Sequence, residues 1–180
     1  MTRRSLFQWL AHAFHGLTAC IVAAPILRFV FIPHGGTTAT RGFQRIAPFS
    51  LTNPGRPVRI TVSADRTDGF IHYPPGPIGV VWLVRNPDGA GSSDNGLRCF
   101  QSICPHLGCA INFARDRGVF FCPCHASEFA ADGARNFGPA PRNMDELPCR
   151  IAGPDDDGQR WVEIQYREFR TGTQQPIPKA

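Results

Sequence analysis

Two similar hexapeptides, each with two cysteines and one histidine, lie close together in this 180-residue chain. Residues 104–109 read CPHLGC, and residues 122–127 read CPCHAS. Thiol and imidazole side chains are ligands for soft and borderline metal ions, and six of them are more than one tetrahedral ion can use. The pattern is too regular for chance, so the rest of the sequence has to indicate what the two hexapeptides hold.

The positions of glycine, proline and short apolar runs predict an all-β domain. The 18 glycines and 17 prolines fall largely between short runs that are rich in β-branched residues. Residues 57–63 alternate apolar and polar side chains, whereas residues 78–85 form the continuous apolar run of a strand buried on both faces. Further strands are expected at residues 97–101, 118–121, 147–152 and 160–167, with a turn at 153–159 between the last two. Many short strands with turn-rich connections indicate an antiparallel fold.

The first 33 residues are typical of a membrane anchor or an export signal. No charged residue occurs from Ser5 to Leu27, and a helix of that length spans about 34 Å, enough for the roughly 30 Å hydrocarbon layer. Pro25 is expected to kink or end this helix. Arg3 and Arg4 resemble the start of a twin-arginine export signal and favour a cytoplasmic N-terminus.

Three fates of this N-terminal segment remain open. It can be an uncleaved anchor, a cleaved signal peptide, or a signal that ends in lipidation of Cys20 within the sequence LTAC. Residues after Cys20 stay apolar, and no small-residue cleavage site is followed by a polar mature start. We therefore expect an uncleaved transmembrane anchor.

Charge and cysteine content restrict the partners and the compartment. The formal net charge of +5 is spread along the chain without a block of lysine and arginine, so a nucleic-acid partner is not expected. Seven cysteines are easier to accommodate in an oxidising compartment, where some of them can pair. This agrees with export of the domain that follows the N-terminal segment.

The hexapeptides allow three interpretations. A structural zinc site usually collects Cys–Cys and His–His pairs or four thiolates, and it leaves two cysteines unused. A framework of disulfides alone leaves both histidines without a role. The third interpretation uses all six residues. Two thiolates hold one iron of a 2Fe–2S cluster, two imidazoles hold the other, and the remaining cysteines can join the loops by a disulfide.

The two hexapeptides, together with GPAP at residues 138–141, resemble the Rieske iron–sulfur proteins. The similarity is to the disulfide-bearing branch found in quinol-oxidising cytochrome bc complexes, and it covers roughly residues 48–170. It implies an antiparallel all-β Rieske domain, built of base sheets and a small cluster-binding subdomain, with one N-terminal transmembrane helix. The expected organisation is an anchor at 1–33, a hinge linker at 34–47, a Rieske domain at 48–172 with its cluster-binding part at about 99–145, and a tail at 173–180.

The resemblance also assigns roles to the candidate site residues. The implied ligands of the 2Fe–2S cluster are Cys104, His106, Cys122 and His125, and the implied disulfide joins Cys109 to Cys124. Leu107 would be the apolar cover at an exposed tip, and Gly138–Pro141, including Pro139, would be a proline loop that packs over the cluster.

Two further positions bear on the cluster's reduction potential. Ser127 matches the family's serine, which donates a hydrogen bond to a bridging sulfide. Phe129 stands where many high-potential members have a tyrosine that donates to a cysteine ligand. The missing bond, worth about 1–2 kcal/mol, predicts an intermediate potential.

The implied function is electron transfer from quinol to a c-type cytochrome. Neutral imidazoles in place of two thiolates raise the potential of a cluster. The catalytic residues His106 and His125 would couple one electron to one proton at the site where a cytochrome b subunit presents quinol. The expected location is the bacterial inner membrane, crossed once, with the Rieske domain on the periplasmic side.

The main alternative is a soluble periplasmic relay subunit of a molybdenum oxidase. Ala126 and Glu128 resemble the small Rieske subunit of arsenite oxidase, whereas the GPAP loop and the long apolar N-terminus argue against it. Rieske ferredoxins and ring-hydroxylating oxygenases ordinarily lack the two disulfide cysteines, and the oxygenases need a further catalytic domain.

The remaining cysteines and histidines have less specific expectations. Cys99 and Cys149 are expected to be buried thiols, with a second disulfide as the alternative. His34 is expected in the linker and His72 in a proline-rich loop, neither as a metal ligand.

Overall fold

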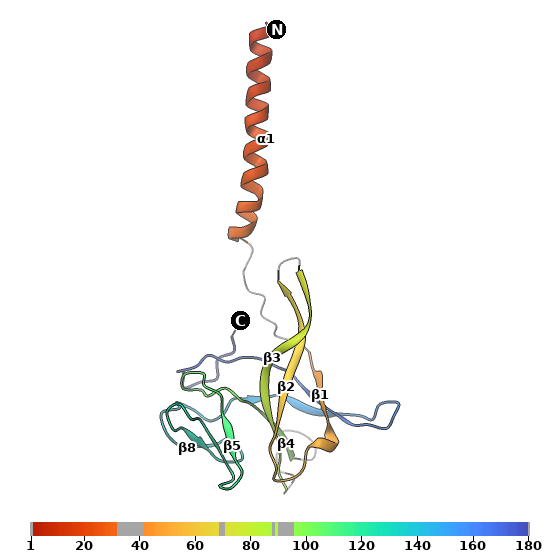
Figure 1. Cartoon of the computed structure of the whole chain (residues 1–180), viewed down its shortest axis with the longest axis vertical. Coiled ribbons are helices and arrows are strands. Elements are labelled where there is room, and N and C mark those ends of the chain that lie inside the picture. Colours follow the sequence, from red (N-terminus) through yellow and green to blue (C-terminus); the bar gives the residue numbers. More distant parts are fainter. Residues whose placement is uncertain (1, 32–41, 69–70, 88, 90–95, 180) are drawn as a thin grey trace. The chain divides into compact units, whose positions relative to one another are not determined.

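The computed structural model describes residues 2–31, 42–68, 71–87, 89 and 96–179 (Figure 1). The chain divides into two compact units, Met1–Gly36 and Thr37–Ala180. The first unit contains the helix α1 (Arg3–Phe31), and the second contains all the described strands.

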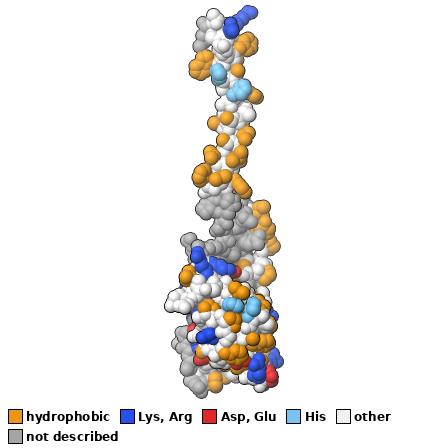
Figure 2. Space-filling model, turned by 90° about the vertical axis from the view of Figure 1, so that its left-hand side faces the viewer, with side chains coloured by type: hydrophobic (Ala, Val, Ile, Leu, Met, Phe, Trp, Pro, Cys, Tyr) orange, Lys and Arg blue, Asp and Glu red, His pale blue; other side chains and the backbone are white. Residues whose placement is uncertain are grey.

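Helix α1 has 29 residues, and none of its side chains is buried. It is long and apolar enough to cross a membrane, a property that helical export signals share. Hydrophobic side chains lie along its whole length on the face shown in Figure 2. Pro25 does not end the helix, because the loss of one backbone hydrogen bond at an internal proline leaves the following turn intact.

Three antiparallel sheets make up the second unit. The first has the strand order β1–β11–β10, the second β2–β3–β4–β9, and the third β5–β6–β7–β8. The bounds in the first sheet are β1 Gln44–Pro48, β10 Cys149–Ala152 and β11 Trp161–Ile164, and a short 3-10 helix, η1 Phe49–Leu51, follows β1. Those in the second are β2 Val58–Asp68, β3 Ile71–Arg85, β4 Leu97–Gln101 and β9 Glu146–Leu147. Those in the third are β5 Asn112–Ala114, β6 Val119–Phe121, β7 Glu128–Phe129 and β8 Arg135–Phe137. This confirms the expected base sheets and smaller additional subdomain.

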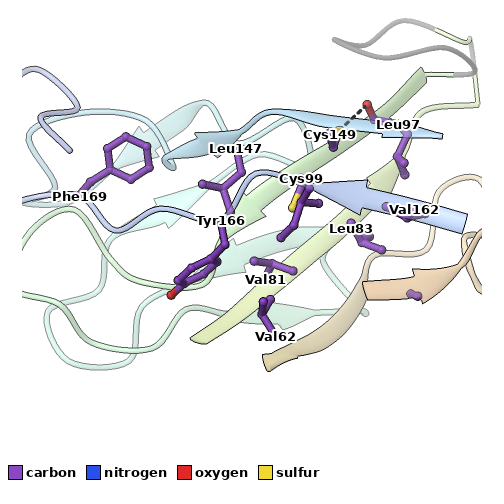
Figure 3. Close-up of a cluster of buried hydrophobic side chains, with 12 residues drawn as sticks. Val62, Val81, Leu83, Leu97, Cys99, Leu147, Cys149, Val162, Tyr166 and Phe169 are labelled. Carbon is purple, nitrogen blue, oxygen red and sulfur yellow. Dashed lines mark hydrogen bonds between the residues drawn. The ribbon is translucent and has the colours of Figure 1, made fainter. Parts of the chain in front are cut away.

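Strand β3 lies between two hydrophobic cores, as its continuous apolar run predicts. Val81 and Leu83 belong to the core between the first two sheets, which Figure 3 shows. Trp82 and Val84 point the other way, into a second core that also contains Cys104 and Cys122. Alternate side chains of a strand face opposite sides of the sheet. Strand β3 therefore packs on one face against the core of the first two sheets and on the other face against the core that contains the hexapeptide cysteines.

The hairpin of β2 and β3 is longer than expected. The alternating pattern predicts a strand that ends at residue 63 and a loop around His72, whereas β2 runs to Asp68 and His72 lies in β3. The register shifts between Val62 and Ser63 and again between Ala64 and Arg66. Proline is tolerated in strands at such irregularities, which explains how the proline-rich segment stays in an extended strand.

Both ends of the domain differ from the expected boundaries. Residues 44–47 were assigned to the hinge, but they lie in β1, where Ala47 is buried and pairs with Val162 of β11. The rest of the hinge, including His34 and Gly35–Gly36, falls largely outside the described residues and stays a prediction. The expected tail at 173–180 is part of the domain, because Phe169 forms a β-bridge with Pro178.

Candidate metal centre

Two closed loops present the hexapeptides. The first, residues 104–109, lies between β4 and β5, and the second, residues 122–127, joins β6 to β7. In the first loop the Cys104 N–H donates to the Cys109 carbonyl at 2.8 Å, and the Gly108 N–H donates to the Cys104 carbonyl at 3.0 Å. In the second the Cys122 N–H donates to the Ser127 carbonyl at 2.8 Å. Each loop therefore has a candidate cysteine ligand fixed at its base.

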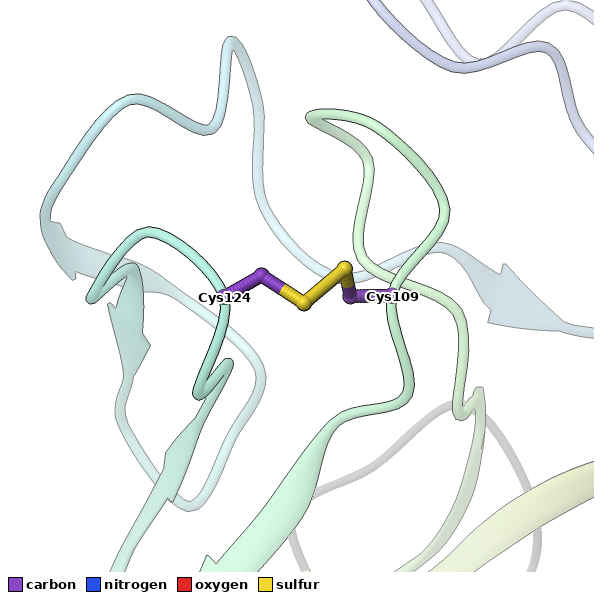
Figure 4. The surroundings of a disulfide bond; sticks show 2 residues. All are labelled: Cys109 and Cys124. Atoms are coloured by element: carbon purple, nitrogen blue, oxygen red, sulfur yellow. A yellow bond between two sulfur atoms is a disulfide. The ribbon is translucent and has the colours of Figure 1, made fainter.

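A disulfide between Cys109 and Cys124 joins the two loops (Figure 4). This is the pairing that the family resemblance implied. The cysteines are 15 residues apart in sequence, and closing a loop of that size stabilises a fold by about 3 kcal/mol. The disulfide therefore sets the separation of two loops whose backbones are irregular.

The other two cysteines of the hexapeptides form a buried thiol pair. Cys104 and Cys122 are almost completely buried in the same hydrophobic core, close enough for Cys122 to contribute to the raised pKa of the Cys104 thiol. Burial raises the pKa of Cys104 to about 11, although the His106 backbone N–H and the Ser127 hydroxyl act on that pKa in the opposite direction. A metal cation beside such a thiol removes its proton, so the pair suits a bound metal.

The two histidines form the outer part of the site. The ring centroids of His106 and His125 are 4.8 Å apart, with the ring planes nearly perpendicular at 86°. The Nδ1 atom of His106 is buried and has no hydrogen-bond partner among the described residues. Buried polar atoms are normally satisfied, so this nitrogen is free to bind a metal. The donor set therefore fits a cluster held by two thiolates and two imidazoles.

Three other sulfur atoms of the two loops lie close to one another but do not form a single-ion site. Within the described part of the chain, the sulfur atoms of Cys109, Cys122 and Cys124 lie within 4.8 Å of one another. Two of these atoms form the disulfide and cannot act as thiolate ligands. The trio shows that the disulfide passes close to the Cys122 thiol.

The proline loop is held against the second hexapeptide. The Ser127 hydroxyl is buried and accepts a hydrogen bond from the Ala140 N–H at 3.1 Å. Gly138 has a φ of +97°, and a Cβ atom there would lie 2.5 Å from the Ser127 Cα atom. Only glycine allows this close approach. Pro139 itself is exposed, as is Leu107 at the tip of the first loop, where the side chain is 63% accessible.

The structure places three supporting residues that sequence reasoning missed. The Gly172 N–H donates to the Pro105 carbonyl at 2.8 Å, inside the first hexapeptide. Arg142 forms a buried ion pair with Asp145 and donates hydrogen bonds to two residues of the C-terminal segment. The partners of Arg142 in that segment are 28 and 31 residues away in sequence, so no local pattern indicates these contacts.

Cys99 and Cys149 are buried and not disulfide-bonded, which confirms the default expectation over a second disulfide. Burial raises the pKa of Cys99 well above its usual value. Both residues belong to the core between the first two sheets, away from the core that contains Cys104 and Cys122.

A family model described as the Rieske [2Fe-2S] domain matches residues 51–149. The chain belongs to the Rieske iron–sulfur family. The [2Fe-2S] cluster is therefore the cofactor of this Rieske protein, in agreement with the donor set of the two loops.

Curated relatives of this Rieske protein include iron–sulfur subunits of cytochrome b6-f complexes. This protein is 27% identical over 168 residues to the subunit of Synechococcus sp. (strain JA-3-3Ab). The match covers 93% of this chain and 92% of that protein. This protein is 35% identical over 164 residues to the chloroplastic subunit of Pisum sativum. The match covers 82% of this chain and 66% of that protein. This protein is 38% identical over 97 residues to the chloroplastic subunit of Bigelowiella natans, and this match spans only 34% of that protein's length.

The contact between Gly138 and Ser127 predicts that Gly138→Ala disrupts the site. The added Cβ atom would collide with backbone atoms of the second hexapeptide, so we expect loss of most of the bound cluster and a lower melting temperature. Cluster content by visible absorption and unfolding by circular dichroism measure the two effects. Gly118→Ala is the control, because Gly118 also has a positive φ of +67° but nothing lies within 4 Å of its Cβ position. Equal cluster content in the two variants would contradict the prediction.

Proposed function

We propose that this protein is the electron-transfer subunit of a cytochrome bc-type quinol oxidoreductase. The observation behind this proposal is the placement of His106 and His125 on the outer side of a buried thiol pair, next to the exposed Leu107. The iron–sulfur subunit of a Synechococcus cytochrome b6-f complex, which matches along almost its whole length, supports the same assignment.

The ligands of the cluster are Cys104 and Cys122 on the inner side, and His106 and His125 on the outer side. When bound, the 2Fe–2S cluster supplies a one-electron acceptor. The inner cysteines lie in the second core beside Phe120 and Phe129, which keeps water away from them. The histidine side faces the surface, and Figure 2 shows imidazole side chains beside hydrophobic ones on the strand-bearing unit.

The two histidines accept the proton that leaves the quinol hydroxyl. A neutral imidazole that binds a metal through one nitrogen still carries a proton site on the other. That outer nitrogen loses its proton more readily beside a highly charged metal, and it holds the proton more tightly when the charge falls. With the cluster bound, the outer nitrogen of His106 or of His125 would hydrogen-bond the quinol hydroxyl and take up its one proton as the electron leaves. Leu107 provides an apolar contact for the same partner.

The subunit is anchored in the bacterial inner membrane by α1, with the strand-bearing domain on the periplasmic side. Arg3 and Arg4 precede the apolar run and favour a cytoplasmic N-terminus. The complex to which the subunit belongs contains a cytochrome b subunit, which presents quinol to the cluster. A c-type cytochrome then accepts the electron from the cluster.

Redox-poised electron paramagnetic resonance of native membranes tests this function. We expect the spectrum of the reduced cluster to shift when a quinol-site inhibitor is added, because the inhibitor takes the place of quinol beside the histidines. The signal should also stay with the membranes after high-salt and carbonate washes. A signal that is indifferent to the inhibitor, or that washes off, would contradict the proposal.

Phe129→Tyr is predicted to raise the midpoint potential of the cluster. Phe129 is buried in the same core as Cys104 and Cys122, and a new hydroxyl there can donate to a cysteine sulfur. One hydrogen bond of about 1–2 kcal/mol corresponds to a rise of about 40–90 mV, at 59 mV per 1.4 kcal/mol for one electron. Redox titration of the purified protein measures the shift. Phe137→Tyr is the control, because Phe137 is exposed and should leave the potential unchanged. An unchanged or lower potential in the Phe129 variant would refute the assignment.

A further inference from the structure

One peptide group lies between two proposed ligands and accepts a hydrogen bond from the C-terminal part of the chain. It consists of the Pro105 carbonyl and the His106 N–H. The carbonyl accepts a hydrogen bond from the Gly172 N–H at 2.8 Å. The His106 N–H acts on the neighbouring Cys104, where it lowers the pKa of the thiol against the larger, opposite effect of burial. Gly172 has a φ of +72°, a conformation that glycine adopts without strain. A residue near the C-terminus therefore orients a peptide dipole whose positive end faces a cluster ligand.

The segment that contains Gly172 is itself a closed loop. The Arg170 N–H donates to the Ile177 carbonyl and the Lys179 N–H to the Glu168 carbonyl, both at 2.8 Å. Thr171 lies beside the first hexapeptide, because its Cγ2 atom is 3.8 Å from the Cβ position of Gly108. We call residues 168–179 the C-terminal loop. It packs against the ligand loop instead of leaving the domain.

Arg142 fastens this loop to the domain. Its guanidinium group donates two parallel hydrogen bonds of 2.8 Å to Asp145, and their side chains are only 8% and 4% exposed. It also donates to the Arg170 carbonyl at 2.8 Å, and to both the carbonyl and the hydroxyl of Thr173. Gly172 lies between these two residues, so Arg142 fixes the backbone on either side of it.

Arg142 is also tied to both parts of the site. It follows the proline loop directly, where Ala140 bonds to Ser127. The carbonyl of its partner Asp145 accepts from the N–H of Gln101, three residues before Cys104. An arginine with all its donors engaged in a buried position is therefore connected to both ligand loops.

We propose that Arg142 and Gly172 are positioning residues that, through the C-terminal loop, hold the Pro105–His106 peptide toward the sulfur of Cys104 and so set the potential of the cluster. The inference rests on the ligand assignment under the proposed function. An oriented N–H stabilises the negative charge that arrives on reduction, and this effect is largest when the dipole is held in place before the electron arrives. Loosening the C-terminal loop should therefore lower the midpoint potential.

Arg142→Lys in the full-length protein with its cluster tests the proposal. Lysine keeps a positive charge beside the buried Asp145, but a single ammonium group cannot reproduce the arginine fork and its bonds to Arg170 and Thr173. We expect the equilibrium constant for one-electron reduction to fall about threefold, or about 28 mV at 59 mV per tenfold. Hydrogen exchange at the backbone amides of Cys104 and Gly108 should speed up as well.

Arg98→Lys is the matched control. Arg98 makes the same kind of fork with Glu146, at 3.0 and 2.7 Å, and also donates to the Asp132 carbonyl. None of these partners belongs to a ligand loop or to the C-terminal loop. We expect this variant to lose stability while keeping the wild-type potential and the wild-type exchange at residues 104–109.

The outcomes separate the proposal from the function on which it rests. If both variants melt earlier but keep the wild-type potential and the wild-type exchange in the first hexapeptide, Arg142 is merely structural and the proposal is overturned. If the wild-type protein itself holds no 2Fe–2S cluster, the proposed function fails. Hydrogen exchange at residues 104–109 still shows whether Arg142 and the C-terminal loop hold the first hexapeptide. Thr173→Val serves if the lysine variant does not fold, because it removes one accepting hydroxyl from Arg142 and should shift potential and exchange in the same direction.

Discussion

Two thiols and two imidazoles can share one cluster only if the loops that contain them keep a fixed separation. Backbone ladders cannot provide this, since the ligand segments are irregular turns at the ends of short strands. The disulfide between Cys109 and Cys124 provides a covalent limit on the separation. Ser127 and Gly138 add a close contact between the second loop and the proline loop, and the Gly172 N–H holds the Pro105 carbonyl of the first loop.

The chemistry depends on an unequal distribution of burial across the site. Cys104 and Cys122 extend the hydrophobic core that also contains Trp82 and Val84 of β3. Burial raises the pKa of the Cys104 thiol, so a thiolate at that position is favoured by a bound metal. His125 is exposed, and His106 is only partly buried although its Nδ1 atom is enclosed. A redox centre in this setting has one dry side, where sulfur holds it, and one accessible side, where a substrate can donate an electron together with a proton.

The parts that followed local rules could be predicted from the sequence. Period-two and continuous apolar patterns located β2, β3, β4, β10 and β11, and the paired motifs identified the disulfide as well as the family. Strand β1 was missed because its residues lack a clear alternation and it forms by pairing with β11, more than 100 residues away. Arg142 and Gly172 were missed for the same reason, since their partners are distant in sequence and no motif marks them.

The most direct measurement is electron–nuclear double resonance on the reduced, purified protein labelled with [¹⁵N]histidine. If sulfur holds the inner iron and imidazole the outer one, the spectrum of a single 2Fe–2S signal will show two strongly coupled histidine nitrogens. Loss of one coupling in a His106 variant and of the other in a His125 variant would identify them. A cluster without any histidine coupling, or a preparation that contains zinc in place of iron and sulfide, would contradict the account.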